Sequence, residues 1–325
     1  MKDLPKIELH LHLEGAAPPD FVRGLAQEKG VNLSGVFDAR GGYAYDDFPG
    51  FLATYEAATS VLRSPVDYAR LTREVLGRSS EHGVIYTEIF VSPDFCGGRD
   101  LAAWREYLAA IEEAAAHVPG IEMRVVATCI RHFGPDIARE AARCAAETAG
   151  NFVTGFGMGG NEGVGRQGDY AWAFDCAREA GLGLTTHAGE FGGPDSIRQA
   201  LDDLHVSRIG HGVRAIEDLA LVDRLAEDGT VLEVCPGSNV ALGLHAKIGA
   251  HPIEKMRARG VAVTVSTDDP PFFDTDMSAE YEALHDAFGW DEEIFADLNR
   301  TAVRAAFCDA GTRDALMKRL DRGSA

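Results

Sequence analysis

The feature that most constrains this chain is a regular alternation between short apolar segments and longer segments with helical patterning. Eight segments rich in β-branched and aliphatic residues predict strands, at residues 6–13, 84–91, 121–130, 152–158, 183–187, 207–211, 230–235 and 261–267. Between most of them, apolar residues recur at spacings of three and four, which is typical of helices. Eight successive strand–helix units predict an α/β protein with a parallel (β/α)₈ TIM barrel.

Two stretches lie outside this alternation. Residues 16–81 separate the first two strands and predict a helical insertion after the first strand. Residues 278–322 predict a helical C-terminal tail. The sequence contains no low-complexity linker, so we expect residues 1–325 to form a single barrel domain.

The first predicted strand carries the motif His10-Leu11-His12. Side chains along a strand alternate between its two faces, so the two imidazoles point the same way and the flanking leucines point the other way. Two imidazoles on one face can bind one zinc ion. The alternative is a pair of packed core histidines, and the motif by itself does not exclude it.

Three further predicted strands end in polar residues. The strand at 183–187 ends in His187 and is followed by Glu190, the strand at 207–211 ends in His211, and the strand at 261–267 is followed by Asp268 and Asp269. In a (β/α)₈ barrel the C-terminal ends of all strands meet at one face, where active sites lie. Residues more than two hundred positions apart are therefore expected to share one site.

For some of these residues the sequence is equally compatible with a structural role. Glu190 could cap the helix that begins near residue 195, and Asp269 before a proline could be a turn residue. His211 lies between two glycines and could also belong to a turn. The glycine-rich run at 155–160 lacks both the Gly-Lys-Ser/Thr of a phosphate loop and the third glycine of a dinucleotide fingerprint, which excludes those readings.

Composition excludes several classes of protein. The formal net charge of −20 argues against a nucleic-acid partner. No apolar stretch approaches the roughly 20 residues of a membrane-spanning helix, and the N-terminus lacks the apolar region of a signal peptide. The six scattered cysteines are typical of reduced thiols. We therefore expect a cytoplasmic protein without membrane or nucleic-acid partners.

Taken in order, the motifs resemble those of the adenosine deaminase family of metal-dependent barrels. The matching segments span almost the whole chain. They are residues 9–15 (LHLHLEG), 159–162 (GGNE), 186–190 (THAGE), 210–213 (GHGV), 235–239 (CPGSN) and 266–270 (STDDP). The cytosine-type zinc deaminases use His-x-Glu with Pro-Cys-x-x-Cys instead, and this chain has neither element.

The resemblance implies a role for each matching residue. One zinc ion would be held by four ligands, namely His10, His12, His187 and Asp268. Glu190 would handle the proton at purine N1, and His211 would orient the attacking hydroxide. Asp269 would contact the water and purine N7, and the backbone N–H of Gly160 would meet N3. Glu14 would reach the ribose, and a hydrophobic lid would be formed by Phe48, Phe51 and Tyr55.

The same resemblance bears on the substrate, a small-molecule purine. Relatives that take free adenine tend to have Ser-Asp-Asp-Pro and Asp-His-Gly, where this chain has Ser-Thr-Asp-Asp-Pro at 266–270 and Gly-His-Gly at 210–212. These differences favour hydrolytic deamination of adenosine and 2′-deoxyadenosine, as in purine salvage. The alternative is adenine or a modified adenine nucleoside such as 6-aminodeoxyfutalosine. The sequence does not indicate an oligomeric state.

Overall fold

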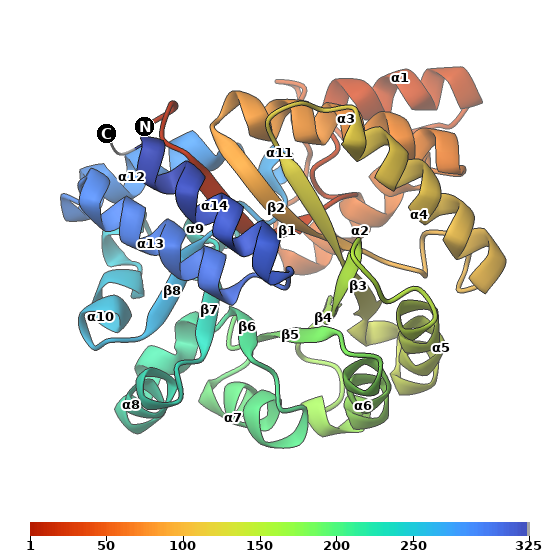
Figure 1. Cartoon of the computed structure of the whole chain (residues 1–325). Helices are drawn as coiled ribbons and strands as arrows, with labels where there is room; N and C mark the ends of the chain where they lie inside the picture. Colours follow the sequence, from red (N-terminus) through yellow and green to blue (C-terminus); the bar gives the residue numbers. More distant parts are fainter. Residues whose placement is uncertain (324–325) are drawn as a thin grey trace.

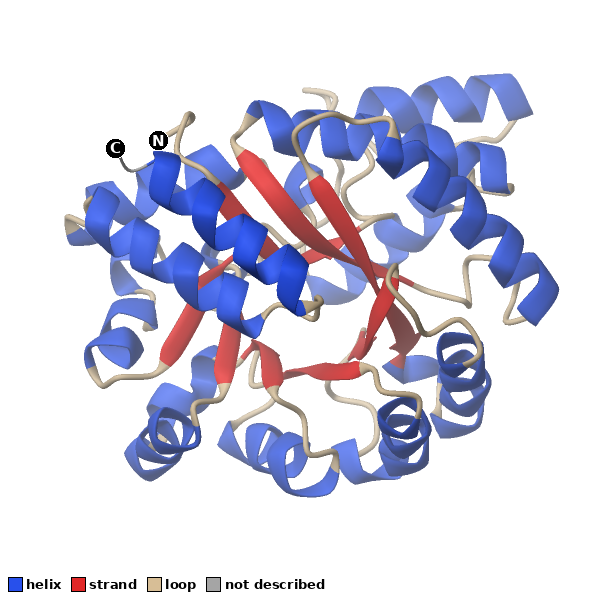
Figure 2. Ribbon diagram, viewed as in Figure 1, coloured by secondary structure: helices blue, strands red, loops and turns tan. Residues whose placement is uncertain are grey.

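The computed structural model describes residues 1–323 and contains one sheet of eight parallel strands in the order β1 to β8 (Figures 1 and 2). The strands are β1 (Lys6–His12), β2 (Val84–Val91), β3 (Glu122–Ile130), β4 (Val153–Gly159), β5 (Gly183–Ala188), β6 (Arg208–His211), β7 (Val231–Val234) and β8 (Ala262–Val265). Most of their side chains are buried, as expected for parallel strands covered by helices on the outside. The predicted (β/α)₈ barrel is confirmed.

Backbone hydrogen bonds join the first strand of the barrel, β1, to the residues that follow the last strand, β8. Leu11 and Asp268 form an isolated parallel bridge. The His12 N–H donates to the Asp268 carbonyl at 3.0 Å, and the Asp268 N–H donates to the His10 carbonyl at 3.1 Å. Backbone hydrogen bonds therefore fix the segments that carry three of the four expected metal ligands.

Helices surround the barrel in the expected alternation (Figure 2). The outer helices are α4 (Leu101–Ala116), α5 (Pro135–Ala146), α6 (Ala171–Glu179), α7 (Pro194–Asp203), α8 (Leu219–Asp228) and α10 (Ile253–Ala258). Shorter helical segments follow several strands, namely η1 (Arg131–Phe133), η2 (Gln167–Tyr170), η3 (Val213–Glu217), α9 (Pro236–Ala241), η4 (Ile248–Ala250) and α11 (Pro270–Phe273). Residues at their N-termini favour the start of these helices. Asp100 accepts the Ala103 N–H at the start of α4, and proline stands in the first turn of α5 and of α7.

The insertion after β1 is helical, as predicted, and forms α1 (Pro19–Lys29), α2 (Phe48–Thr59) and α3 (Pro65–Glu81). Helix α2 begins at Asp47, whose side chain accepts the Gly50 N–H at 2.8 Å. Phe48, Phe51 and Tyr55 recur at helical spacing and therefore share one face of α2. That face turns toward the C-terminal end of the barrel.

The tail is also helical, as predicted, and forms α12 (Met277–Phe288), α13 (Glu292–Ala305) and α14 (Ala310–Gly323). Ile7 and Leu9 of β1 pack in one apolar cluster with residues of α13 and α14, which cross the front of the barrel in Figure 1. A side chain at Gly183 would collide with the Phe307 ring, so glycine is required there for this close approach. The tail thus covers the end of the barrel opposite α2.

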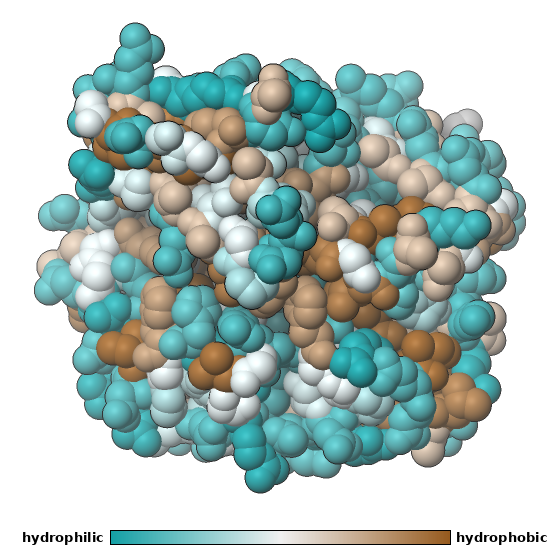
Figure 3. All heavy atoms as spheres, turned by 180° about the vertical axis from the view of Figure 1, so that it is seen from behind, coloured by the Kyte–Doolittle hydropathy of each residue, from teal (hydrophilic) through white to brown (hydrophobic). Residues whose placement is uncertain are grey.

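The surface is mixed in character. On the side opposite to the view of Figure 1, apolar side chains gather toward the middle and hydrophilic ones dominate the edges (Figure 3). Within residues 1–323, none of the helices combines the length and the apolarity that crossing a bilayer requires.

Candidate metal centre and catalytic pocket

Four side chains from distant parts of the chain converge at the C-terminal end of the barrel. They are His10 and His12 of β1, His187 of β5, and Asp268 after β8, and their ligand atoms all lie within 4.8 Å of one another. The Nε2 atom of His187 is 3.1 Å from that of His10 and 3.2 Å from that of His12. Asp268 Oδ1 is 3.2 Å from His12 Nε2 and 3.5 Å from His10 Nε2. The structure thus brings together all four predicted ligands.

The hydrogen bonds of two of these histidines indicate that the cluster is built for a cation. His10 Nδ1 lies 2.8 Å from a carboxylate oxygen of Glu233, and His187 Nδ1 donates to the Met158 carbonyl at 2.9 Å. Each neutral ring therefore carries its proton on Nδ1 and turns a bare Nε2 lone pair toward the other. Two such lone pairs at 3.1 Å repel unless a metal ion or a proton lies between them. Burial lowers the pKa of His10, but the hydrogen bonds to Asp268 and Glu233 raise it to about 9, so the site attracts positive charge.

The spacing of the ligand atoms fits zinc. Histidine nitrogen and aspartate oxygen bind Zn²⁺ at about 2.0–2.2 Å, so two atoms bound to the same ion lie no more than about 4.4 Å apart. Four of the six separations within the cluster are 3.1 to 3.5 Å and meet this condition. A buried set of three imidazoles and one carboxylate is thus a suitable site for one divalent ion.

Glu233 of β7 orients His10, and the sequence motifs do not reveal it. Its carboxylate contacts His10 on one side, and its Oε1 lies 2.6 Å from Arg208 Nε and accepts the Thr185 hydroxyl at 3.0 Å. Burial alone would raise the pKa of Glu233, but the Arg208 guanidinium and the bond to His10 hold that pKa below its usual value. Arg208 is also 2.6 Å from Glu88. Glu88, Arg208 and Glu233 therefore form a buried charge network that contacts the metal cluster at His10.

The backbone at the site is strained at two functional residues. Asp268 and His211 have φ angles of 67° and 63°, in the left-handed region that favours glycine. Strain of this kind persists only where surrounding contacts enforce it, and it is found often at active sites. At Asp268 one such contact is the Ser238 hydroxyl, which donates to Oδ2 at 2.7 Å.

Glu190 lies in the loop after β5 and faces the metal cluster. Its Oε2 atom is 3.7 Å from His211 Nε2. Burial raises the pKa of Glu190 well above its usual value, and the charges of Asp268 and Glu162 raise it further. The alternative capping role does not apply, because Gly193 is the N-cap of α7 and no side chain caps that helix. Burial and the neighbouring charges therefore favour the protonated form of Glu190, which is the form that a proton donor requires.

The loop that carries Glu190 is held by one carboxylate. Glu162 accepts the backbone N–H groups of Gly189, Glu190, Phe191 and Gly192 at 2.6, 3.0, 2.8 and 2.7 Å, and also the Ser196 hydroxyl at 2.7 Å. Glu162 belongs to a motif that we identified in the sequence, but its role as the anchor of this loop was not predicted. Five donors on one buried carboxylate fix the position of Glu190 closely.

His211 presents a defined ring nitrogen to the site. Its Nδ1 is 3.4 Å from Asn239 Nδ2, and an amide NH₂ can only donate, so the ring proton is on Nε2. Asn239 is in turn bonded through its Oδ1 to His251 Nε2 at 3.1 Å. Burial lowers the pKa of His211 to about 4, so the ring is neutral and its Nε2–H points toward Glu190 and Asp268.

Asp269 is fully enclosed beside the cluster. Its Oδ1 has no hydrogen-bond partner among the residues that the structure describes. Burial raises the pKa of Asp269 well above its usual value, and the neighbouring charge of Asp268 adds to the effect. A side chain at Gly15 would collide with this carboxyl group, which explains the glycine there. Burial thus favours the protonated form of Asp269, and its Oδ1 atom is free to meet a polar group of a ligand.

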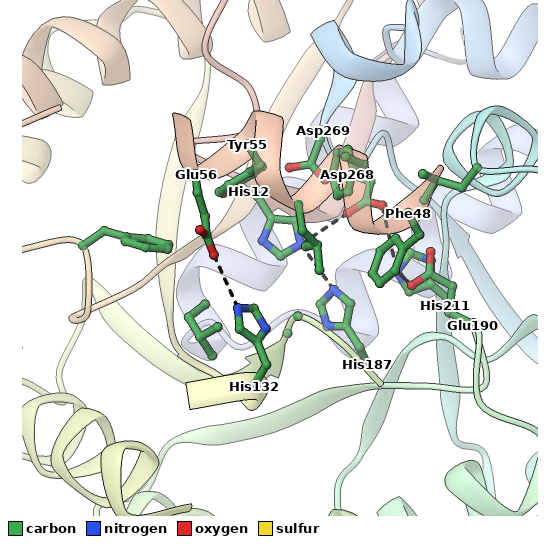
Figure 4. A pocket seen from close by; sticks show the side chains of 17 residues that line it. His12, Phe48, Tyr55, Glu56, His132, His187, Glu190, His211, Asp268 and Asp269 are labelled. Carbon is green, nitrogen blue, oxygen red and sulfur yellow. Dashed lines mark hydrogen bonds and ion pairs between the residues drawn. The ribbon is translucent and has the colours of Figure 1, made fainter. Parts of the chain in front are cut away.

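These groups open into a cavity of about 80 Å³, shown in Figure 4. Its lining residues are His12, Phe48, Phe51, Leu52, Tyr55, Glu56, Phe95, Ile130, His132, Gly159, Gly160, His187, Glu190, His211, Leu242, Asp268 and Asp269. The predicted lid residues of α2 and the predicted backbone contact at Gly160 all border it. Glu56 and His132 were not predicted.

Glu14 does not border the cavity in the described part of the chain. It is buried and accepts the Tyr68 hydroxyl at 3.0 Å, and burial raises its pKa to about 7. The sequence placed Glu14 on the same face as the two histidines because strand residues alternate. However, β1 ends at His12 and a turn follows, so the alternation does not extend to residue 14. Its position gives no support to the expected ribose contact.

The barrel and this histidine–aspartate cluster define an amidohydrolase-type (β/α)₈ protein. Comparison with known proteins narrows that class. The adenosine deaminase family model matches residues 5–323, and the chain belongs to that family. It is accordingly a deaminase, a hydrolase acting on carbon–nitrogen bonds.

Named relatives and solved structures resemble the whole chain. Adenine deaminase of Rhizobium leguminosarum bv. trifolii is 49% identical over 321 residues, which cover 98% of this chain and 99% of that protein. Adenine deaminase of Agrobacterium fabrum is 48% identical, covering 98% of both. The crystal structure of adenine deaminase from Arthrobacter aurescens superposes with a TM-score of 0.90 at 31% identity, covering 98% of both chains. A zinc-bound amidohydrolase from Burkholderia ambifaria gives 0.87 at 28% identity, covering 99% of this chain and 92% of that one.

Proposed function

We propose that this protein catalyses the zinc-dependent hydrolysis of free adenine to hypoxanthine and ammonia. One observation carries the proposal: three of the four clustered ligands, His12, His187 and Asp268, border the same cavity as the buried acid Glu190. The relatives at 48–49% identity, which are named adenine deaminases, support the choice of base.

The reaction replaces the exocyclic amine at C6 with oxygen from water. A zinc ion held by the cluster would supply the nucleophile, because it lowers the pKa of water enough to give hydroxide near neutral pH. Glu190 donates a proton to ring N1 as C6 is attacked, which breaks the aromaticity at lower cost. The Nε2–H of His211 stabilises the charge that develops on the attacking oxygen. The proton of the added hydroxyl then passes to the C6 amine, which leaves as ammonia, and the 6-oxo purine remains; Glu190 regains the proton that water lost when the hydroxide formed.

Two further groups orient the ring in this proposal. Burial favours the protonated form of Asp269, and in that form it would donate to N7, which is an acceptor in the 9H form of adenine. The backbone N–H of Gly160 donates to N3. The aromatic side chains of α2, including Phe48 over the cavity in Figure 4, cover the base and exclude water.

The two sequence motifs that favoured adenosine lie at packing positions. Thr267 of the Ser-Thr-Asp-Asp-Pro motif donates both its N–H and its hydroxyl to Glu8 and does not border the cavity in the described chain. Gly210 of the Gly-His-Gly motif makes room for the ring of His10. Both positions are therefore compatible with free adenine as the substrate.

The expected sugar contact, Glu14, does not border the cavity among the described residues and instead accepts the Tyr68 hydroxyl. This position agrees with a base as the substrate.

Steady-state deamination by zinc-loaded protein tests the proposal. The substrates are adenine, adenosine, 2′-deoxyadenosine and 6-aminodeoxyfutalosine at matched concentrations. We expect kcat/KM for adenine to exceed the others by at least about tenfold. A higher kcat/KM for any of the nucleosides would reject free adenine as the substrate while retaining the deaminase chemistry.

A further inference from the structure

The cavity has a second polar end that the proposed chemistry does not use. Glu56 of α2 and His132 of η1 face each other there, with Glu56 Oε1 3.7 Å from His132 Nε2 (Figure 4). His12 and His187 lie between this pair and the group formed by Glu190 and His211 in the same view. The Glu56–His132 pair therefore marks the end of the cavity away from the proton donor.

The position of His132 is fixed by the backbone of β4 and the residues after it. The Asn161 N–H donates to His132 Nδ1 at 3.3 Å, so the neutral ring carries its proton on Nε2 and offers it to Glu56. A side chain at Gly160 would come within 2.7 Å of His132 Nδ1, so the ring lies directly against Gly160. The His132 ring thus accepts a hydrogen bond from the backbone at Asn161 and faces Glu56 of helix α2 on its other side.

The ring structure of a purine predicts that its N9 atom lies at the Glu56–His132 end of the cavity. The reaction requires C6 at the metal cluster, and N9 is on the opposite side of the bicyclic ring from C6. N9 is also separated from N3 by a single carbon, so a base whose N3 meets Gly160 directs N9 toward His132 and Glu56. In free adenine N9 carries a proton, whereas in a nucleoside it carries the sugar.

We propose that Glu56 is a specificity-determining residue that accepts the N9–H of free adenine, with His132 holding its carboxylate in place. This inference rests on the proposed function, and it explains how the same site would reject nucleosides. A sugar at N9 removes the donor and directs a bulky group at the pair. Where the bound base displaces water from Glu56, a ligand without the N9 donor leaves the carboxylate unpaired, and the site discriminates against that ligand.

Other features of Glu56 agree with a role in binding a ligand. Its side chain is 56% exposed, and at 3.7 Å its contact with His132 is long for a hydrogen bond, so the pair contributes little to the stability of the protein by itself. Its neighbours at this end are apolar, including Phe95 and Ile130. A carboxylate among apolar groups gains a partner when a ligand N–H arrives.

The test compares adenine with 9-methyladenine, which differs only by a methyl group in place of the N9 proton. The wild-type protein should prefer adenine strongly in kcat/KM. For Glu56→Ala we expect this preference to fall by about tenfold or more, because a hydrogen bond to a charged group is lost for adenine alone. His132→Ala should reduce the preference in the same direction by a smaller factor.

Leu52→Ala is the matched control, because Leu52 borders the cavity one turn earlier on the same helix and offers no hydrogen bond. It should change the kcat/KM of both compounds alike. An unchanged preference in Glu56→Ala would overturn the role of Glu56 even if the wild type deaminates adenine. Failure of the wild type to deaminate adenine would instead overturn the proposed function, so the two failures are distinguishable.

Discussion

The carboxylate of Glu162 holds the catalytic loop, and its replacement by glutamine gives a prediction that can be worked out atom by atom. Glutamine has one acceptor oxygen. It can keep at most the three N–H bonds that now reach Oε2, from Glu190, Phe191 and Gly192. Its NH₂ group would then face the Gly189 N–H, which now donates to Oε1.

The stability change follows from that count. One buried N–H without a partner costs about 1–3 kcal/mol, and the three remaining bonds lose the assistance of the charge. We expect Glu162→Gln to lower the free energy of unfolding by about 2–5 kcal/mol, measured by urea denaturation. Ser196→Ala removes one hydroxyl donor and leaves all four N–H bonds, so it should cost only about 0.5–1.5 kcal/mol.

The same variant should alter catalysis in two ways. Displacement of the loop moves Glu190, and a shift of about 1 Å in a catalytic group can cost on the order of 100-fold in rate. Loss of the Glu162 charge also lowers the pKa of Glu190, because that charge is one of the causes that raise it. Only protonated Glu190 can donate, so activity falls as pH rises through this pKa, and in the variant the fall should begin at lower pH. A variant with wild-type stability, kcat and pH profile would refute this reasoning.

Two further predictions concern the support of the metal cluster and the loop. Glu233→Gln should weaken metal binding by about 10–100-fold, because the carboxylate that orients His10 is lost; zinc content after competition with a chelator measures it, and unchanged retention would contradict it. Gly189→Ala should destabilise the protein more than Gly181→Ala, as judged by urea denaturation. Both glycines have positive φ angles, but a side chain at Gly189 would collide with Ile197, whereas Gly181 has open space around it. Equal losses would contradict this packing argument.

The fold could be predicted from sequence because each barrel strand is buried on both faces. Such strands appear as continuous apolar runs, and the predicted segment at 84–91 coincides with β2. The four-ligand cluster could be predicted for a related reason. Strand ends meet at one face of a barrel, so His10 and Asp268 can be associated without any local motif that joins them.

The supporting residues could not be predicted because their partners are fixed only by the tertiary structure. Glu56 and His132 come from a helix and a short helical segment that are distant in sequence, and no motif connects them. Glu233 does carry a signal, since it is the only charged residue in the apolar strand β7, but the sequence does not name His10 as its partner. The ribose contact expected for Glu14 stays a prediction, because the strand β1 ends at His12 and the sequence does not show how the following turn directs that side chain.

The most direct test of the account is to measure zinc content and adenine deamination on the same preparation of Glu190→Gln. Glu190 is not a metal ligand in this account, so the variant should retain the zinc content of the wild type. Its kcat should fall by about 10²–10⁴-fold, because glutamine cannot donate a proton to N1. Wild-type kcat with zinc bound would contradict the assignment of Glu190 as the proton donor, and loss of zinc would contradict its separation from the metal cluster.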